Sequence, residues 1–492
     1  MATRVAAAAL MLALPATDPA QGGQSHRDTW FEASLAGLRA GVVSETVESI
    51  EDSLLLTTVV TALAVERFGE RVDLRQKDEW LETRAGRAME YRSTRRLAAG
   101  EETALRVAVE PDRLVISKTA GREEYDSEQG LDRELVFPEA LARLHARRGF
   151  VEGDVYSYVA FDPDFELAGA CAVKVVGRET LSMSGEGVDL NHIRVVPELY
   201  EGMAIDEWRD DRGYLWLQRW PALGMETRRI TEAEAARSTA VPDIAESTVI
   251  GTNAAISTPG LVDEALYEVW IEGGDVRELL PEDTRQAIEG RTDRGVLLRV
   301  ARVVPSVDAP RVEKPGDQFS PYLESNPLLQ ANDPEVGASA EAVAHPSDGA
   351  WEAALRIADE VARTIDDDGY GVAFASASEV LSTRSGDCSE HAVLAAAMAR
   401  SLGIPSRLAT GVVYFRLGFG YHMWIEVWTG DGWYAVDPTQ GGRAVDATHI
   451  LLGVSSLSGG RVGELSLPVL RTANRLNIRI VEYVVEGEKV TP

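Results

Sequence analysis

The first half of the chain alternates apolar and polar residues with a period of two, and this pattern constrains its fold most strongly. The runs Leu105-Arg106-Val107-Ala108-Val109 and Arg113-Leu114-Val115-Ile116-Ser117 flank a turn at Pro111-Asp112. Such alternation predicts strands with one buried face and one solvated face. Similar runs lie at 155–161 and 214–220, and short helices are indicated at 138–147 and 232–237. We therefore expect residues 21–247 to form a β-rich, mostly antiparallel region, and we leave open whether it has two related halves.

Two segments of different composition follow this region. Residues 266–271 and 295–300 continue the strand pattern, so we expect residues 248–303 to form a β-rich connecting module. Residues 304–349 are rich in proline. Proline at that density predicts a linker, or a loop over a neighbouring surface, instead of regular structure.

Residues 350–456 change to helices followed by strands. An amphipathic helix is predicted at 351–365, a short helix around 379–381, and a third helix from Cys388 to a stop at Gly403. Strands are predicted at 407–414, 421–429 and 432–437, with Asp431-Gly432 as the turn between the last two. This order is typical of an α+β domain. Alternation at 476–480 predicts a β extension within residues 457–492.

Cys388 stands where a turn becomes the third of these helices. Asp387 has the position of an N-cap, and Glu390 follows at the spacing of a capping box. Partial positive charge and free backbone N–H groups gather at a helix N-terminus, and both favour thiolate over thiol. We therefore expect Cys388 to be a nucleophile whose own N–H can face a developing oxyanion.

Strand alternation organises further candidates downstream. His422 is expected to share one strand face with Trp424 and Glu426, while the intervening apolar residues share the other. Asp437 ends the next strand, and equal strand lengths put it near the level of His422. A carboxylate there can take one ring N–H and stabilise the imidazolium. We expect Trp424 and Trp433 to bind substrate as cleft walls, with a place in the core as the alternative, and Glu426 to bind an amine or form an ion pair.

Four blocks of sequence, in order, resemble the core of the transglutaminase-like superfamily. They are Gly386-Asp387-Cys388-Ser389-Glu390-His391-Ala392, Arg400-Ser401-Leu402-Gly403-Ile404-Pro405-Ser406-Arg407, His422-Met423-Trp424-Ile425-Glu426-Val427 and Trp433-Tyr434-Ala435-Val436-Asp437-Pro438-Thr439. The likeness covers about residues 379–442, and more loosely 351–449. It implies a papain-like catalytic domain of α+β class with Cys388 as nucleophile, His422 as general base and Asp437 as the residue that orients it.

The resemblance implies cysteine-dependent chemistry on carboxamides or peptide bonds through a thioester. Water as acceptor gives hydrolysis, as in a protease or amidase, and an amine gives protein-glutamine acyl transfer. We expect hydrolysis of a protein or peptide, because cross-linking requires an amine site from which water is excluded. The alternative is a catalytically inactive domain in a binding or scaffolding protein, since most of the chain lies outside the four blocks.

The other cysteine and the other histidines have weaker claims to function. Cys171 lies in an apolar, strand-like run and is expected to be buried, although a disulfide with Cys388 is an alternative. His391 would point along the Cys388 helix and is a weaker candidate for the base. His449 could shape the site or only pack. The histidines at 26, 145, 192 and 345 lack metal-ligand spacing with cysteine, and we expect neither a metal nor a cofactor.

Charge and the N-terminal residues bear on partners and location. The formal charge of −30 disfavours binding to nucleic acid, whose phosphates it would repel. Arg4, an apolar run at 5–14 and small residues up to Ala20 indicate a signal peptide at 1–20. We therefore expect a periplasmic or secreted protein, with an N-terminal membrane anchor as the alternative. No later run is long and apolar enough to span a membrane, and the oligomeric state is not indicated.

Overall fold

The computed structural model describes residues 27–50, 53–67, 70–97, 102–120, 123–237, 241–242, 249–306, 316–366 and 375–492. The chain divides into two compact units, one ending at Ile244 and one running from Ala245 to Pro492. The expected signal peptide at 1–20 lies outside the described residues. Across the ranges given above, no helix has both the length and the apolar character needed to cross a membrane.

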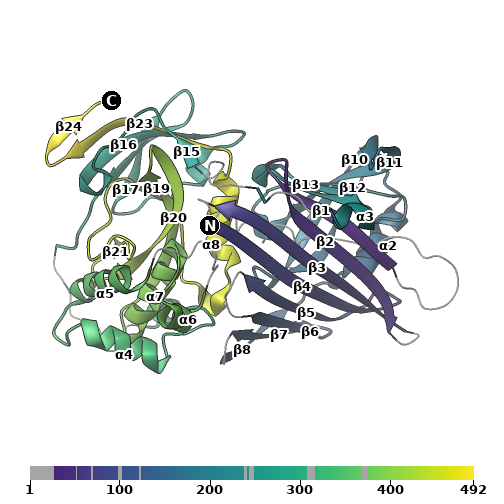
Figure 1. Ribbon diagram of the computed structural model, residues 1–492, viewed down its shortest axis with the longest axis horizontal. Coiled ribbons are helices and arrows are strands. Elements are labelled where there is room, and N and C mark those ends of the chain that lie inside the picture. The colour runs from purple at the N-terminus through teal and green to yellow at the C-terminus, as the bar shows by residue number, and fades with distance from the viewer. Residues whose placement is uncertain are drawn as a thin grey trace. The chain divides into compact units, whose positions relative to one another are not determined.

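One antiparallel sheet of 14 strands contains all the named strands in the described part of the N-terminal unit (Figure 1). Its spatial order is β8-β7-β6-β5-β4-β3-β2-β1-β14-β13-β12-β11-β10-β9, so two meanders meet where β1 pairs with β14. The strands are β1 (Arg27–Leu35), β2 (Leu38–Ile50), β3 (Leu54–Arg67), β4 (Glu70–Thr83), β5 (Ala88–Leu97), β6 (Thr103–Val109), β7 (Arg113–Ala120), β8 (Glu123–Gly130), β9 (Val155–Asp162), β10 (Leu167–Met183), β11 (Glu186–Pro197), β12 (Ile205–Arg209), β13 (Leu215–Trp220) and β14 (Met225–Ile230). The N-terminal region is therefore mostly antiparallel β, as the alternation predicts.

The sheet buries the apolar partners of the alternating runs. In β6, Val107 is fully buried whereas Arg106 is exposed, and Leu114 of β7 is also fully buried. Two short helices interrupt the strands, α2 (Pro138–Arg148) and α3 (Glu232–Ala235). Helix α2 is tied to the sheet through Glu82, which accepts from Arg143 at 3.0 Å. The two meanders form one continuous sheet.

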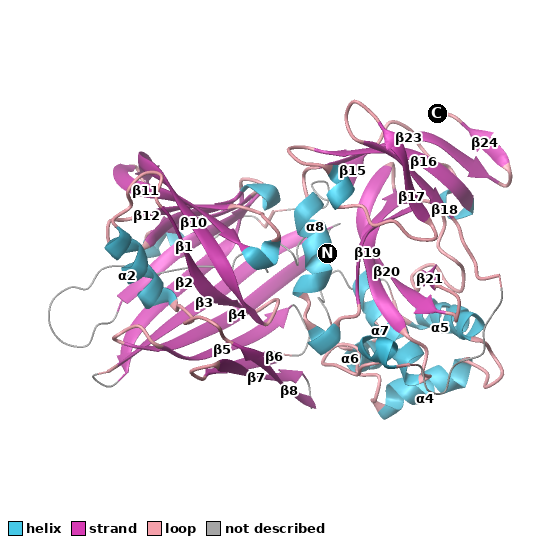
Figure 2. Ribbon diagram, turned by 180° about the vertical axis from the view of Figure 1, so that it is seen from behind, coloured by secondary structure: helices cyan, strands magenta, loops and turns pink. Residues whose placement is uncertain are grey.

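Two five-stranded sheets and a group of helices build the described part of the C-terminal unit (Figure 2). One sheet has the order β15-β20-β19-β22, with β21 also paired to β20, and the other has the order β17-β18-β16-β23-β24. Their strands are β15 (Val249–Gly251), β16 (Val262–Ile271), β17 (Gln286–Arg291), β18 (Val296–Ala301), β19 (Ser406–Phe415), β20 (Gly418–Trp428), β21 (Trp433–Val436), β22 (His449–Ser455), β23 (Leu476–Val485) and β24 (Glu488–Val490). The helices are α4 (Pro334–Val343), α5 (Ala350–Thr364), α6 (Ala377–Thr383), α7 (Cys388–Ser401) and α8 (Gly463–Thr472).

Helix α7 lies at the centre of the helical group. Helices α4, α5 and α6 pack against it, and it packs in turn against β19 and β20 (Figure 2). Its side chains are buried from Ser389 to Arg400, which agrees with the run of small residues in this helix. The first residue of α7 is therefore held by the packing of the whole helix against its neighbours.

The expectation that residues 304–349 lack regular structure is wrong for α4. Pro334 occupies the first turn of this helix, where the N–H that proline lacks would have no helical partner. Asp333 caps the helix by accepting from the backbone N–H of Glu335 at 2.8 Å. Val336 and Ala340 are fully buried, so this segment is part of the core. Proline density here marks a helix start and turns, and residues 307–315 lie outside the described part of the chain.

The segments expected as a connecting module and as a C-terminal extension form one sheet. Strand β16 pairs with β23, with Tyr267 opposite Ile480. The short strand β15 instead joins the edge of β20, with Val249 opposite Gly420. Pairing between strands so far apart in sequence leaves no local signal. The two segments were therefore predicted as separate parts of the chain, although their strands form one sheet.

Candidate active site

Helix α7 begins at Cys388 because the residues before it cap its N-terminus. Asp387 accepts from the backbone N–H of Ser389 at 2.8 Å, and Glu390 accepts from the backbone N–H of Asp387 at 3.0 Å. The bond between Glu390 and the N–H of Asp387 is one half of the capping box that the spacing predicts, and in the other half Asp387 accepts from the backbone N–H of Glu390. Glu390 can fold back because Gly386 has no side chain, since a Cβ there would lie 2.3 Å from Cβ of Glu390. The cap thereby fixes the place of Cys388 in the first turn.

Cys388 is half-buried and carries a free thiol. Its position at the start of α7 exposes it to the positive end of the helix dipole. Cys171 is also free, so the alternative disulfide between the two cysteines is not formed. Burial raises the pKa of the Cys171 thiol to about 12.

Strands β20 and β21 bring His422 and Asp437 together. The register pairs Ile425 with Val436, so the next step along each strand places Asp437 beside Trp424, two residues from His422. The side chains bridge this distance with a hydrogen bond of 2.8 Å between His422 Nε2 and Asp437 Oδ2. The other carboxylate oxygen of Asp437 accepts from the backbone N–H and the hydroxyl of Thr439, at 2.9 and 2.8 Å.

The charges around His422 favour its protonated form. Burial alone would lower the pKa of His422, but the charges of Asp437 and Cys388 outweigh it and hold that pKa well above its ordinary value. Burial would likewise raise the pKa of Asp437, but the charge and hydrogen bond of His422 dominate and hold it well below its ordinary value. Asp437 occupies Nε2, which leaves Nδ1 as the ring nitrogen available to Cys388, whose charge and hydrogen bond also raise the pKa of His422. The three side chains named from sequence are thus brought together.

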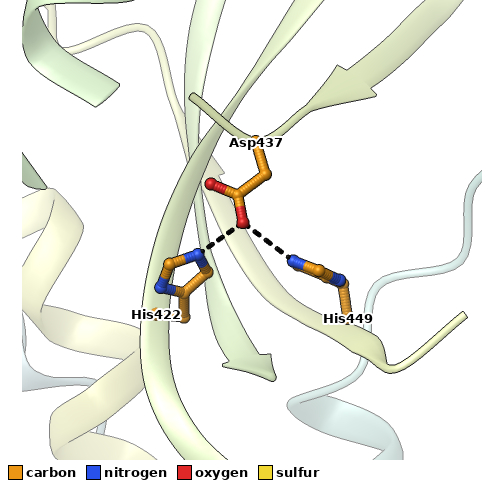
Figure 3. Close-up of side chains that lie close together, drawn as sticks. All are labelled: His422, Asp437 and His449. Atoms are coloured by element: carbon orange, nitrogen blue, oxygen red, sulfur yellow. Dashed lines mark hydrogen bonds and ion pairs between the residues drawn. The ribbon is translucent and has the colours of Figure 1, made fainter. Parts of the chain in front are cut away.

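A second imidazole shares the same carboxylate oxygen. Figure 3 shows Asp437 between His422 and His449, and His449 Nε2 lies 3.1 Å from Asp437 Oδ2. The other ring nitrogen of His449 lies 3.3 Å from Oδ1 of Asp446. His449 is the first residue of β22 and is fully buried.

Asp446 was missed by the sequence analysis, although a local pattern could have found it. Asp437-Pro438-Thr439 and Asp446-Ala447-Thr448 have the same spacing of aspartate and threonine. In both, one aspartate oxygen accepts from the backbone N–H and the hydroxyl of the threonine two residues later. This arrangement is an Asx turn, and it leaves the aspartate side chain fixed and able to accept from a histidine.

His422, Asp437 and His449 are also of the residue types that bind metal ions, and one ligand atom of each lies within 4.8 Å of the others. A metal ion held by all three would take Nε2 of both rings and a carboxylate oxygen. Those nitrogens and Oδ2 of Asp437 already form the two hydrogen bonds of this cluster. A metal ion would have to displace the protons between them, so the donor set fits a hydrogen-bonded cluster better than a resident metal.

The two tryptophans expected to bind substrate have different surroundings. Trp424 is fully buried, and its ring packs against His422 and His449, with ring centroids 6.3 and 5.4 Å apart. It therefore supports the imidazoles from behind and offers no surface to a substrate. Residues on both faces of β20 are buried, so the face that carries His422 and Trp424 is not open to solvent as strand alternation would predict. Trp433 is half-buried, and the guanidinium of Arg407 lies over its ring at 4.4 Å.

The remaining candidates take structural positions. Glu426 forms an ion pair with Arg407 at 2.6 Å and is buried, which favours the ion-pair alternative over the binding of an amine. His391 is buried in α7, where its Nδ1 lies 2.9 Å from the backbone oxygen of Asp387. Neither side chain shares the carboxylate of Asp437, so neither replaces His422 in the cluster.

The model of the transglutaminase-like superfamily matches residues 337–438 of this chain. Comparison with curated proteins gives no match. Solved structures with similarity include a "putative cysteine protease" from Cytophaga hutchinsonii, at 14% identity and a TM-score of 0.29, over 47% of this chain and 84% of that one. A "putative protease" from Parabacteroides distasonis is 12% identical with a TM-score of 0.19, over 77% of this chain and 68% of that one.

A third similar structure has a different description. It is a beta-barrel-like protein of a domain of unknown function from Brucella abortus, 11% identical with a TM-score of 0.32, over 42% of this chain and 94% of that one. The family match covers α5, α6, α7 and the strands from β19 to β21, which carry Cys388, His422 and Asp437. Residues 337–438 of this chain are a transglutaminase-like domain.

Proposed function

We propose that the protein is a cysteine-dependent enzyme that acts on amide or peptide bonds through a thioester. Cys388 is the nucleophile, His422 the general base and acid, and Asp437 the residue that orients His422, in a papain-like, α+β catalytic domain. The observation that carries the proposal is the hydrogen bond of 2.8 Å from His422 Nε2 to Asp437. It fixes the tautomer of the ring and turns Nδ1 toward the thiol at the start of α7.

The first half-reaction forms the thioester. The Cys388 thiolate attacks the carbonyl carbon, a C–S bond forms, and the carbonyl electron pair moves to oxygen. The backbone N–H of Cys388 at the start of α7 can donate to that oxyanion. When the tetrahedral intermediate collapses, the C–N bond breaks and the leaving nitrogen takes the proton of His422 Nδ1. The products are a free amine, a thioester and a neutral imidazole.

The second half-reaction depends on the acceptor. A water molecule gives its proton to His422 Nδ1 as its oxygen attacks the thioester carbon, and the C–S bond then breaks. This step releases a carboxylic acid and regenerates the thiolate and imidazolium. An amine in place of water gives acyl transfer to a new amide. Hydrolysis of a protein or peptide is the reaction we propose, with protein-glutamine acyl transfer as its alternative, because only transfer needs an amine site that excludes water.

The location of the enzyme is a further part of this proposal. The pattern at residues 1–20 supports export by a signal peptide, and hence a periplasmic or secreted enzyme. The 14-stranded sheet of the N-terminal unit would then place or recruit the substrate. A size shift of the purified protein relative to the full chain, with the new N-terminus near residue 20, is the expected result of export.

The pH dependence of alkylation by iodoacetamide tests the chemistry without a known substrate. We expect the Cys388 peptide to be labelled rapidly at pH 6–7 in the folded protein, and much more slowly in His422→Ala. An ordinary thiol, with a pKa of about 8.5, would label slowly in this range. A thiol profile that His422→Ala leaves unchanged would contradict the proposal and favour a binding or scaffolding protein. Positive labelling justifies screening of peptide hydrolysis against amine incorporation.

A further inference from the structure

His449 lies between two carboxylates, and the proposed roles of Cys388 and His422 do not account for this arrangement. Its two ring nitrogens face two carboxylates, Asp437 at 3.1 Å and Asp446 at 3.3 Å, and the ring is fully buried. An ionised carboxylate only accepts hydrogen bonds, so both contacts are satisfied when each nitrogen carries a proton. Burial alone would lower the pKa of His449, but the charge of Asp446 and the bond to Asp437 outweigh it and raise that pKa. The geometry and the raised pKa both favour a protonated ring behind Asp437.

The sheet that contains β16 and β17 braces the segment that carries this cation. Arg285 and Tyr267 donate to backbone carbonyl oxygens at positions 446 and 447, at 3.0 and 2.9 Å. Gln286 exchanges two hydrogen bonds with the backbone at position 451, at 2.9 and 3.0 Å. These contacts reach 161 or more residues along the chain. They hold the backbone on both sides of His449 in place.

We propose that His449 is a positioning residue for the Cys388–His422 pair. As an imidazolium between Asp446 and Asp437, it fixes the carboxylate that orients His422 and reduces the negative charge that this carboxylate presents to His422. The inference rests on the proposed function, because it assigns a role in the same site. His449 is fully buried, so a substrate does not reach it, and its role is exerted through Asp437.

The sign of the effect follows from the charges that face His449. They are the carboxylates of Asp437 and Asp446, the imidazolium of His422 with its ring centroid 5.7 Å away, and Arg285 at the backbone behind. A positive His449 repels the proton on His422 and shares the negative charge of Asp437. Loss of the positive charge therefore makes His422 hold its proton to a higher pH.

Alkylation by iodoacetate, which is negatively charged, reads the protonation of His422. The anion is attracted by the imidazolium, so the rate at Cys388 should rise when the thiolate forms and fall when His422 loses its proton. The decrease of the rate at high pH is the falling limb of this profile. In His449→Gln and in Asp446→Asn, we expect the falling limb to lie about one pH unit higher than in the wild type. The matched control is His345→Gln, an exposed histidine outside this cluster, which should leave both limbs in place.

The outcomes separate this inference from the proposed function. An upward shift of the falling limb in both variants supports the role of His449. A bell-shaped wild-type profile whose falling limb stays in place or moves down in the variants overturns the inference alone, because a purely structural role would lower the rate without moving the limb. A wild-type protein without a bell-shaped profile overturns both proposals.

The protonation of His449 can also be measured directly in the wild-type protein, which tests the inference even if the variants do not fold. Nitrogen-15 spectra of the wild-type histidines should show His449 with protons on both ring nitrogens at pH 7, when an ordinary histidine with a pKa of about 6.5 is mostly neutral. A neutral His449 at that pH would overturn the inference without any substitution.

Discussion

The two cysteines of this chain show how much the surroundings of a thiol decide its chemistry. Cys171 lies in a strand of the N-terminal sheet, is buried, and has its thiol pKa raised by burial to about 12. Cys388 lies at the start of a capped helix, is half-buried, and acts on an imidazole held by a carboxylate. The same side chain is thus an apolar filler in one unit and a candidate nucleophile in the other. The difference lies in hydrogen-bond partners and in access to solvent.

The largest expected effect is the difference in alkylation rate between the two cysteines. At pH 7, a thiol with a pKa near 12 is a thiolate in about one molecule in 10⁵. We therefore expect iodoacetamide to label Cys388 at least ~10³-fold faster than Cys171 in the folded protein, measured by mass spectrometry of the two peptides. In urea the two rates should converge. Comparable rates in the folded protein would remove the distinction between the two thiols.

Asp437→Asn should produce the next largest change. An opposite charge at this distance shifts a pKa by 1–3 units, so the loss of the carboxylate should slow alkylation of Cys388 at pH 6 by about 100-fold. Asp431→Asn is the matched control, because Asp431 accepts from Thr429 at 2.9 Å in the hairpin turn beside β21 and lies outside the cluster. Equal rates for the two variants would mean that Asp437 has no role in the thiol chemistry.

The sequence was sufficient to name the three central residues of the site. Cys388 precedes a helix with a capping box, and period-two alternation with a hairpin turn places His422 near Asp437. The likeness to transglutaminase-like proteins points to the same three. The position of Trp424 could not be deduced, because alternation assumes one open face and β20 is covered on both. The link between Asp437, His449 and Asp446 depends on loops whose conformation leaves no periodic pattern.

The fold was predictable where periodicity is local and not where pairing is distant. Strands and their alternation in the N-terminal sheet follow from the sequence, as do α5 and α7. The order of 14 strands could not be deduced, because β1 pairs with β14 across almost the whole unit. Helix α4 was not predicted because a proline-rich composition is typical of loops, although proline is also favoured in the first turn of a helix, where Pro334 lies. The contacts that Arg285 and Gln286 make near the site could not be predicted for the same reason as the strand order, because contacts between residues so far apart have no sequence signature.

Two buried carboxylates, one in each unit, should respond to pH in opposite directions. Asp437 has partners that lower its pKa, whereas burial raises the pKa of Glu45 in β2 to about 8. Neither oxygen of Glu45 has a hydrogen-bond partner in the described part of the chain, and Arg27 lies 3.5 Å away. The folded protein therefore holds a proton on Glu45 between about pH 4.5 and 8 that the unfolded chain has lost. Unfolding free energy falls with rising pH across that window.

Glu45→Gln tests this contrast. Glutamine cannot ionise, so the variant should lose the pH slope, and its free energy of unfolding relative to the wild type should rise by about 4 kcal/mol between pH 4.5 and 7.5. Urea unfolding at several pH values, read from deuterium uptake of peptides from β2, confines the measurement to the N-terminal unit. Asp437→Asn, read from peptides of β20, should instead lose stability at neutral pH, since a depressed pKa stabilises the folded state above pH 4. The same sign in both variants would contradict the contrast.

The smallest expected effect separates stability from chemistry at a helix cap. Asp387 caps α7 and Asp333 caps α4, each by accepting from a backbone N–H at 2.8 Å, and both helices belong to the C-terminal unit. Replacement of either residue by alanine should lower the free energy of unfolding by about 1 kcal/mol. Only Asp387→Ala should also slow alkylation of Cys388, by a factor of about 3–10, because it loosens the turn that holds the thiol against His422. If Asp333→Ala slows labelling equally, the cap acts through general stability, and the position of Cys388 does not depend on its own cap.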